Sequence, residues 1–164
     1  MRIYIREYTN FSDRNILVFL TRPLLSKSAS EKPFLDLAVT QDGNAALATS
    51  TDRTLTMYDL RTSSLIASSS ATFFHPSTPS CIALSESNSS HVVTGCYDGV
   101  VRVWDLRSTK DPIAFFKVQD AAKVLCADWR RGLVCVGGEG GLEIWKFSDK
   151  EIGAGVVQGE IIKS

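Results

Sequence analysis

The chain has 164 residues, within the usual range of one domain, and its 18 basic residues balance its 18 acidic ones. This balance gives no electrostatic reason to expect binding to nucleic acid or to an anionic membrane. The sequence contains no run of 18 apolar residues, so no transmembrane helix is expected, and its first ten residues lack the apolar core of a secretory signal peptide.

Taken in chain order, residues 1–31 show no regular strand pattern and form an atypical N-terminal segment. From residue 32 onward, short apolar stretches bounded by turn residues predict β-strands. The strands expected first are Phe34–Val39, Ala45–Thr49, Thr54–Tyr58, Cys81–Leu84, Val92–Gly95, Val100–Trp104, Lys123–Trp129, Leu133–Val136 and Leu142–Trp145. Outer strands are expected at Ser64–Ala67, Ile113–Lys117 and Val156–Ile162, and loops at the serine-rich stretches 26–30, 68–70 and 85–90.

Three of the expected hairpins repeat one motif, in which an acid at the turn is followed six residues later by an aromatic residue. The pairs are Asp52 and Tyr58, Asp98 and Trp104, and Glu139 and Trp145. The aromatic residues are 46 and 41 residues apart, a period typical of WD-repeat β-propellers. The predicted fold class is therefore all-β: a partial WD-repeat β-propeller with antiparallel four-stranded blades.

Each repeat is expected to need cover on both faces. Apolar residues stand three and five positions after each acid, so they share one face of the strand, whereas the aromatic residue points to the other. Blades packed against blades provide that cover. We expect three WD repeats over residues 32–150 and a C-terminal tail or closing outer strand over 151–164. Residues 1–31 are either the remnant of a degenerate fourth blade, since Asp13 precedes Phe19 by six residues, or a chance match.

The middle repeat carries the fullest motif, with His75, Thr94, Asp98 and Trp104. In WD repeats these positions form a hydrogen-bond network: the Asp accepts from the turn backbone and the His, the His bonds the hydroxyl, and the hydroxyl receives the indole N–H. Such a network ties a loop to a hairpin turn. The first repeat has Ala48 at the hydroxyl position and the third has Cys135, so their networks should be weaker or absent.

Catalytic, cofactor and metal sites are not expected. His75, Asp98 and a hydroxyl would resemble a catalytic triad, but the hydroxyl belongs to a threonine and no nucleophile elbow is present. The glycines of residues 137–141 precede an alternating strand and not a helix, which favours a hairpin turn over a phosphate cradle. The cysteines have no metal-ligand spacing and are expected to be buried, reduced thiols: Cys81, Cys96, Cys126 and Cys135.

Three stretches from Phe34 onward resemble one eukaryotic family more closely than a generic WD repeat. They are FLDLAV, TGCYDGVVRVWDLRSTK and KVLCADWRRGLVCVGGEGGLEIWK, and the last ends in Ile-Trp-Lys where most repeats end in Trp-Asp. They are similar to the carboxy-terminal blades of the WD-repeat subunit of the pescadillo and block-of-proliferation complex, called PeBoW, or the Nop-seven complex in yeast. The resemblance implies a non-enzymatic scaffold that acts in maturation of the large ribosomal subunit, in the nucleolus and nucleoplasm.

The resemblance also implies partners. Members of this family dock on a second WD-repeat protein and act with a pescadillo-like protein on the pre-60S particle. An amino-terminal ubiquitin-like domain, of which this sequence shows no sign, engages an AAA ATPase. The alternative function is a WD-repeat adaptor in another pathway, such as substrate presentation to a ubiquitin ligase. From the residues alone, partner contacts are suggested only at Arg102, Trp129 and Arg130, because partners usually bind propeller loops.

Family members have seven blades, whereas this sequence has room for about three and part of another. A truncated product, a late start or a misjudged exon would each account for the difference. Three or four blades would leave two blade faces open. We therefore expect the chain alone to be marginally stable, prone to aggregate or self-associating.

Overall fold

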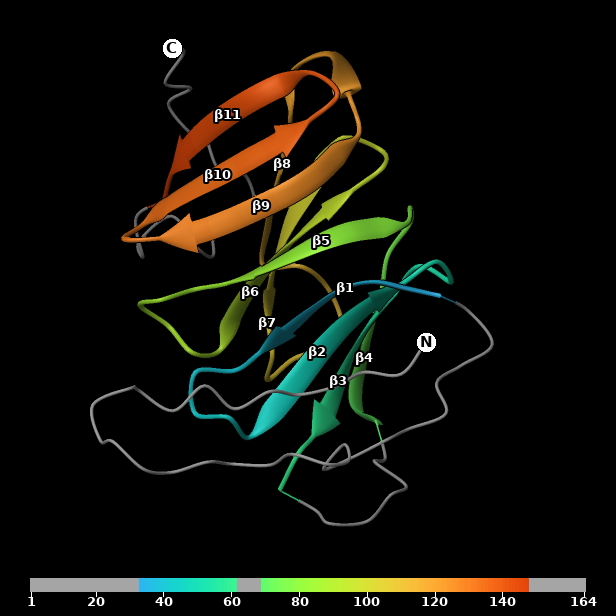
Figure 1. Cartoon of the computed structure of the whole chain (residues 1–164), viewed down its shortest axis with the longest axis vertical. Coiled ribbons are helices and arrows are strands. Elements are labelled where there is room, and N and C mark those ends of the chain that lie inside the picture. Colours follow the sequence, from blue (N-terminus) through green and yellow to red (C-terminus); the bar gives the residue numbers. More distant parts are fainter. Residues whose placement is uncertain (1–32, 62–68, 148–164) are drawn as a thin grey trace, which may run out of the picture.

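The chain forms three antiparallel β-sheets that follow one another in space as they do in sequence (Figure 1). The computed structural model describes residues 33–61 and 69–147. A single 3-10 turn at Gln119–Ala121 interrupts the strands, and the described residues contain no helix able to span a membrane. The three sheets correspond to the three predicted repeats, and we call them blades 1, 2 and 3.

Blades 1 and 2 each contain four strands paired in sequence order. The strands of blade 1 are β1 (Phe34–Val39), β2 (Ala45–Ser50), β3 (Thr54–Asp59) and β4 (Ser69–Phe74). Those of blade 2 are β5 (Pro79–Leu84), β6 (His91–Cys96), β7 (Val100–Asp105) and β8 (Ala114–Lys117). Blade 3 has three described strands, namely β9 (Val124–Arg130), β10 (Leu133–Gly138) and β11 (Gly141–Lys146).

The predicted strands are confirmed with one correction. The inner three strands of every blade lie where the pattern placed them, each within two residues at either end. The fourth strand of blade 1 is Ser69–Phe74, so residues 69 and 70, expected to be a loop, belong to a strand. The stretch expected there, 64–67, lies outside the described residues, as do the strand expected at 156–162 and segments 1–31 and 151–164.

Neighbouring blades bury apolar side chains against each other, and the two interfaces form two separate cores. Between blades 1 and 2, Phe73 meets Trp104 edge-on with ring centroids 5.5 Å apart. Between blades 2 and 3, Phe116 meets Trp145 at 4.3 Å. The repeat aromatic therefore faces the preceding blade. The apolar residues three and five positions after each acid face the following one, which is why both faces of blade 2 are buried.

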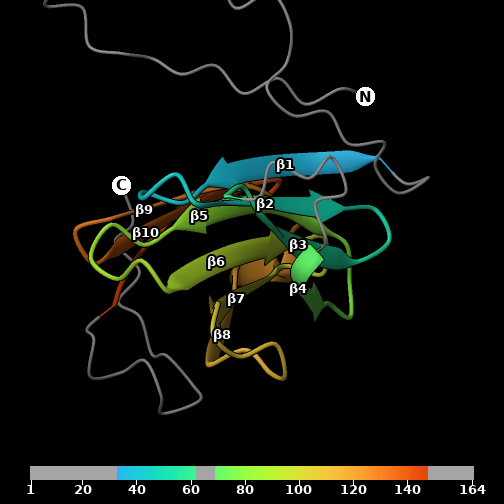
Figure 2. The ribbon, with the colours of Figure 1, turned by 90° about the horizontal axis from the view of Figure 1, so that it is seen from below.

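Two side chains of the inner strands also bond directly to the next blade. The Asp36 carboxylate on β1 accepts a 2.8 Å hydrogen bond from the backbone N–H of Ile82 on β5. The Ser80 hydroxyl on β5 donates to the carbonyl oxygen of Val124 on β9 at 2.5 Å. Figure 2 shows β1 and β5 on one side of the molecule and the outer strand β8 on the other. These bonds therefore fix the spacing of the blades along the edge where the inner strands lie.

The four cysteines are free thiols, but only two are buried as expected. Cys81 and Cys96 lie inside, and burial raises the pKa of Cys81 to about 11 and of Cys96 to about 12. Cys126 is exposed and Cys135 is half-buried, because both lie on the face of blade 3 that points away from blade 2. The expectation of four buried thiols came from the apolar stretches around them, but no residue within 33–61 or 69–147 covers this face of blade 3.

A matched pair of glycines tests the blade-on-blade contact. Gly95 lies between Cys81 and Val101, and a Cβ there would collide with Val124 Cγ1 of blade 3. We predict that Gly95→Ala destabilises the fold by about 1–3 kcal/mol through overpacking. The measurement is denaturant unfolding of the full chain. The control is Gly137→Ala, where a Cβ meets only the exposed Cys126 thiol, which can rotate away. Equal effects of the two substitutions would contradict the assigned packing.

Candidate functional site

A buried chain of polar side chains crosses the interface between blades 1 and 2. The Thr94 hydroxyl on β6 lies 2.9 Å from Trp104 Nε1 on β7 and 2.9 Å from His75 Nε2. His75 follows the last residue of β4, and its Nδ1 lies 3.2 Å from the Phe73 carbonyl oxygen. Three of the four predicted residues therefore meet at one hydroxyl, which joins the end of blade 1 to the middle of blade 2.

The acceptor atoms in this series of hydrogen bonds determine which group donates in each of them. The Phe73 carbonyl can only accept, so His75 carries its proton on Nδ1. His75 Nε2 is then an acceptor and receives the Thr94 hydroxyl proton. The Thr94 oxygen in turn accepts the indole N–H of Trp104. Every donor has an acceptor only while His75 is neutral, and a second proton on Nε2 would leave the Thr94 hydroxyl proton without a partner.

Asp98 does not join this chain, which corrects the prediction that it would accept from His75. Its carboxylate accepts from the backbone N–H of Val100 at 3.1 Å and from Arg102 Nη2 at 2.8 Å. Partial burial would raise the pKa of Asp98, but the Arg102 guanidinium and the Val100 N–H outweigh it and lower that pKa below its ordinary value. Asp98 thus closes the β6–β7 turn with a buried arginine as its partner.

Burial governs the protonation of His75. The side chain is 5% exposed, and this desolvation lowers its pKa from 6.5 to about 4, against the opposing effect of the Phe73 carbonyl. Thr94 is 0% exposed and its oxygen is already used twice. A nucleophile must reach its substrate, so this arrangement cannot act as a Ser-His-Asp triad does. Its chemistry is structural, since it satisfies polar groups that the two blades bury.

The other two hairpins depart from this arrangement, as the sequence predicted. In blade 1, Asp52 bonds the backbone N–H and hydroxyl of Thr54, and Ala48 takes the hydroxyl position opposite Thr56. In blade 3 the hairpin is one residue shorter. The position matching Thr94 is therefore Val136, which lies opposite Glu143, and not Cys135 as predicted.

The shorter hairpin of blade 3 gives Trp145 a different partner. Its Nε1 donates to the Glu143 carboxylate at 3.0 Å. The turn acid Glu139 is exposed and pairs with Lys123 at 3.2 Å, not with the turn itself.

The structure separates the three candidate partner-binding residues. Arg102 is buried against Asp98, and Trp129 is 3% exposed within the core between blades 2 and 3. Neither can contact a partner directly, so these two predictions are wrong. Arg130 is exposed beside the β9–β10 turn and bonds Asp128 at 3.1 Å. The sequence Trp129-Arg130-Arg131 is typical of a loop tip. However, β9 continues through Arg130, and the Trp129 indole points into the core between blades 2 and 3.

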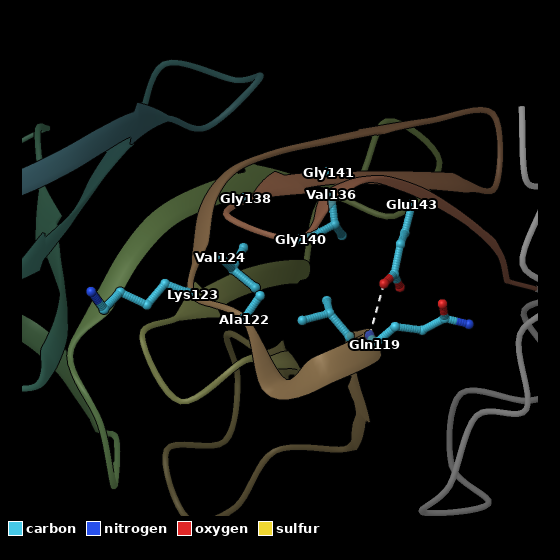
Figure 3. Close-up of a pocket in the computed structure, with 10 residues that line it drawn as sticks. Gln119, Ala122, Lys123, Val124, Val136, Gly138, Gly140, Gly141 and Glu143 are labelled. Carbon is cyan, nitrogen blue, oxygen red and sulfur yellow. Dashed lines mark hydrogen bonds between the residues drawn. The ribbon is translucent and has the colours of Figure 1, made fainter.

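A small pocket lies between the 3-10 turn and the β10–β11 hairpin (Figure 3). Its volume of about 10 Å³ is room for no more than one water molecule. The Glu143 carboxylate crosses it to accept a 2.7 Å hydrogen bond from the backbone N–H of Gln119. The glycines at its rim, Gly138 and Gly140, allow the close approach of Lys123 and Ala122. The pocket is therefore too small for an organic ligand, and the bond from Gln119 to Glu143 links the β10–β11 hairpin to the 3-10 turn.

Within 33–61 and 69–147, no three His, Cys, Asp or Glu residues lie together as metal ligands.

Removing the Thr94 hydroxyl tests the polar chain. We predict that Thr94→Val destabilises the protein by about 2–4 kcal/mol, because Trp104 Nε1 and His75 Nε2 both lose their buried partner. Thr72→Val is the control, since Thr72 is a half-buried strand residue whose hydroxyl has no part in this chain. Both are compared with the parent chain by denaturant unfolding. A loss no larger than that of the control would show that the hydroxyl contributes nothing.

The lowered pKa of His75 predicts an acid-sensitive fold. The unfolded chain takes up a proton near pH 6.5, whereas folded His75 does so only near pH 4. Stability should be constant above about pH 6.5 and fall by up to about 3 kcal/mol between pH 6.5 and 4. The measurement is the unfolding free energy of the parent chain and of His75→Gln across this range. The variant should lose most of the slope, and an unchanged slope would place the sensitive group elsewhere.

Comparison with known proteins places these blades in a recognised architecture. Residues 67–105 match the family described as "WD domain, G-beta repeat". The β-propeller domain of Cps50 (Swd1) from Myceliophteria thermophila superimposes on 80% of this chain and 39% of that chain, with a TM-score of 0.63 and 14% identity. A chain of the mitotic checkpoint complex superimposes on 82% of this chain and 42% of its own length, with a TM-score of 0.67 and 16% identity. These likenesses concern the fold alone.

Other known proteins have a much higher sequence identity with this chain than these structural neighbours do. Ribosome biogenesis protein YTM1 of Laccaria bicolor is 61% identical over 127 residues, which is 76% of this chain and 28% of that protein. The protein of the same name from Coprinopsis cinerea is 58% identical over 120 residues, covering 73% of this chain and 27% of its own length. A ribosome biogenesis protein WDR12 homolog from Aedes aegypti is 31% identical over 63% of this chain and 24% of its own length.

The chain thus spans less than a third of the length of these relatives. The described blades form part of a WD-repeat β-propeller, in a chain similar over three quarters of its length to proteins named for ribosome biogenesis.

Proposed function

We propose that this chain is part of a WD-repeat scaffold that acts in maturation of the large ribosomal subunit by binding other proteins. One observation carries the proposal: the 61% identity over 127 residues with a protein named for ribosome biogenesis. The match spans 127 residues, well beyond residues 67–105, where the chain matches the general WD-repeat family. The six other matched relatives carry ribosome biogenesis names as well.

The scaffold has no catalytic step in this proposal. The buried His75–Thr94–Trp104 chain is saturated by its own hydrogen bonds, and the pocket beside Glu143 holds at most a water molecule. A binding role requires rigid blades that present loops, and this architecture has them. The exposed loops at the end of the blades that carries Arg130 are the proposed contact region, with Arg130 its first candidate residue.

The proposed partners follow from the resemblance stated above. They are the second WD-repeat protein and the pescadillo-like protein of the PeBoW complex, bound on the pre-60S particle in the nucleolus and nucleoplasm. Contact with the AAA ATPase would require a ubiquitin-like domain outside these blades. The alternative, an adaptor for a ubiquitin ligase, is not favoured, because none of the matched relatives carries a name of that kind.

Affinity purification tests the proposal. We predict that the tagged full chain, expressed in cells of its own source, recovers a second WD-repeat protein together with large-subunit assembly factors. Arg130→Glu should reduce that recovery several-fold, since reversing an exposed charge weakens a contact at this end of the blades. Lys117→Glu is the matched control, an exposed charge reversal on the outer strand of blade 2.

Two results would count against the proposal. Recovery of ubiquitin-ligase subunits without assembly factors would favour the adaptor. Recovery of neither by a chain that is folded by circular dichroism would refute binding by these blades. Unchanged recovery with Arg130→Glu would remove Arg130 from the contact and leave the scaffold function standing.

A further inference from the structure

Two buried nitrogen atoms in the interface between blades 2 and 3 have no hydrogen-bond partner among the described residues. They are Nε1 of the Trp129 indole on β9 and Nδ1 of the His91 imidazole on β6. Trp129 is 3% exposed, and the two rings are nearly parallel, with planes 13° apart and centroids separated by 6.5 Å. Both nitrogen atoms therefore lie in one interface, and each of the two blades contributes one of them.

The hydrogen bonds around His91 show that its Nδ1 is a donor. The backbone N–H of Ser90 donates to Asn88 Oδ1 at 3.0 Å, so the other atom of that amide, Nδ2, carries the hydrogens. Asn88 Nδ2 lies 3.3 Å from His91 Nε2, which is therefore the acceptor of this bond. The proton of the neutral imidazole is then on Nδ1, and the imidazolium carries one there as well. The interface thus buries two N–H donors.

Two buried donors without acceptors destabilise a fold, because each has lost its hydrogen bonds to water. Native proteins therefore pair nearly all buried polar groups, either with protein atoms or with ordered water. The other indoles of this protein follow that rule, since Trp104 donates to Thr94 and Trp145 donates to Glu143. The donors of Trp129 and His91 need an acceptor other than the described protein atoms.

A third polar group lies beside His91. Asp105 stands directly opposite His91 across the β6–β7 pair, so the two side chains share one face of blade 2. The backbone N–H, Nε and Nη2 of Arg107 all donate to the Asp105 carboxylate. These hydrogen bonds, and less strongly the charge of His91, lower the pKa of Asp105 to about 2, so the carboxylate is ionised at neutral pH. A carboxylate offers about four acceptor positions, so it can accept one further donor.

The charges of these three groups determine which kind of ligand fits between them. The ionised Asp105 carboxylate disfavours an anion, and the two N–H hydrogens disfavour a cation. A small neutral molecule that both accepts and donates hydrogen bonds remains. We propose that one water molecule is bound between blades 2 and 3, where its oxygen accepts from Trp129 Nε1 and His91 Nδ1 and one hydrogen is donated to Asp105. Three hydrogen bonds are typical of a buried water.

This water links the two blades at the end opposite to their direct hydrogen bonds. The bonds that join Ser80 to Val124 and Gln119 to Glu143 lie near the end of the blades that carries the β6–β7 turn. His91 is the first residue of β6 and lies at the other end. Polar groups thus connect the blades at both ends of their interface. The inference is independent of the proposed function, since it concerns the interior of the blades and no partner.

A high-resolution crystal structure of the full chain tests the site directly. We expect one ordered oxygen atom at about 2.7–3.2 Å from both Trp129 Nε1 and His91 Nδ1, and at a similar distance from an Asp105 carboxylate oxygen. A carboxylate oxygen of Asp105 turned into that place overturns the proposal. So does the finding that no single atom lies within hydrogen-bond distance of both nitrogen atoms.

A second test removes a single donor and needs no crystal. Trp129 is replaced by 3-benzothienylalanine, which has the shape of tryptophan but carries sulfur in place of the indole N–H. Since the replacement breaks one hydrogen bond of the water, the unfolding equilibrium constant of the full chain should rise about tenfold in denaturant unfolding. The same replacement at Trp104, which donates directly to Thr94, gives the size of the effect for a paired indole. Unchanged or increased stability after the Trp129 replacement would show that its N–H has no partner, and would overturn the proposal.

Two matched aspartates test the acceptor. Asp59 of blade 1 accepts the same three hydrogen bonds from Arg61 that Asp105 accepts from Arg107. Asp59→Ala and Asp105→Ala therefore each remove one ion pair, but only Asp105→Ala also removes the acceptor of the water. We expect Asp105→Ala to raise the unfolding equilibrium constant several-fold more than Asp59→Ala, and this excess to disappear when Trp129 is replaced by the analogue. Equal effects of the two substitutions in the parent chain would exclude Asp105 from the site and contradict the proposal.

Discussion

Cover on both faces of every blade is the constraint on which this structure depends. A four-stranded sheet with apolar residues on one face and an aromatic residue on the other cannot be stable alone in water, because burying either face leaves the second exposed. Blade 2 meets this constraint fully: Trp104 packs against Phe73 of blade 1, and Phe116 against Trp145 of blade 3. Within the described part of the chain, blades 1 and 3 are covered on one face each.

The polar groups follow from the same packing. Once Trp104 is buried between blades, its indole N–H needs an acceptor, and Thr94 provides one. The Thr94 hydroxyl then needs an acceptor of its own, which neutral His75 supplies. In blade 3 the shorter hairpin puts Val136 at that position, and Glu143 replaces the hydroxyl as the acceptor for Trp145. Two different acceptors thus serve the indoles of Trp104 and Trp145, whereas the buried Nε1 of Trp129 has no hydrogen-bond partner among the described residues.

Much of this arrangement follows from periodicity alone. The spacing of Asp52, Asp98 and Glu139 from their aromatic residues predicts the number of blades and the inner strands, because hairpin chemistry is local in sequence. Three features do not follow. The strand β4 begins at serines, which carry a loop signal that pairing with β3 overrides. Arg102 pairs with Asp98 only because the turn brings their side chains to one side. Trp129 precedes two arginines and is buried by contacts with a neighbouring blade that sequence does not reveal.

Neighbouring blades stabilise each other through their shared interface, and a double-mutant cycle measures the coupling free energy between them directly. Phe73→Leu and Trp104→Phe remove the edge-on aromatic contact from its two sides, and their unfolding free energies are compared with that of the double variant. The packing described here predicts a coupling energy of about 0.5–1.5 kcal/mol between residues 31 positions apart in sequence. Additive effects of the two substitutions would mean that blades 1 and 2 do not stabilise each other through this contact.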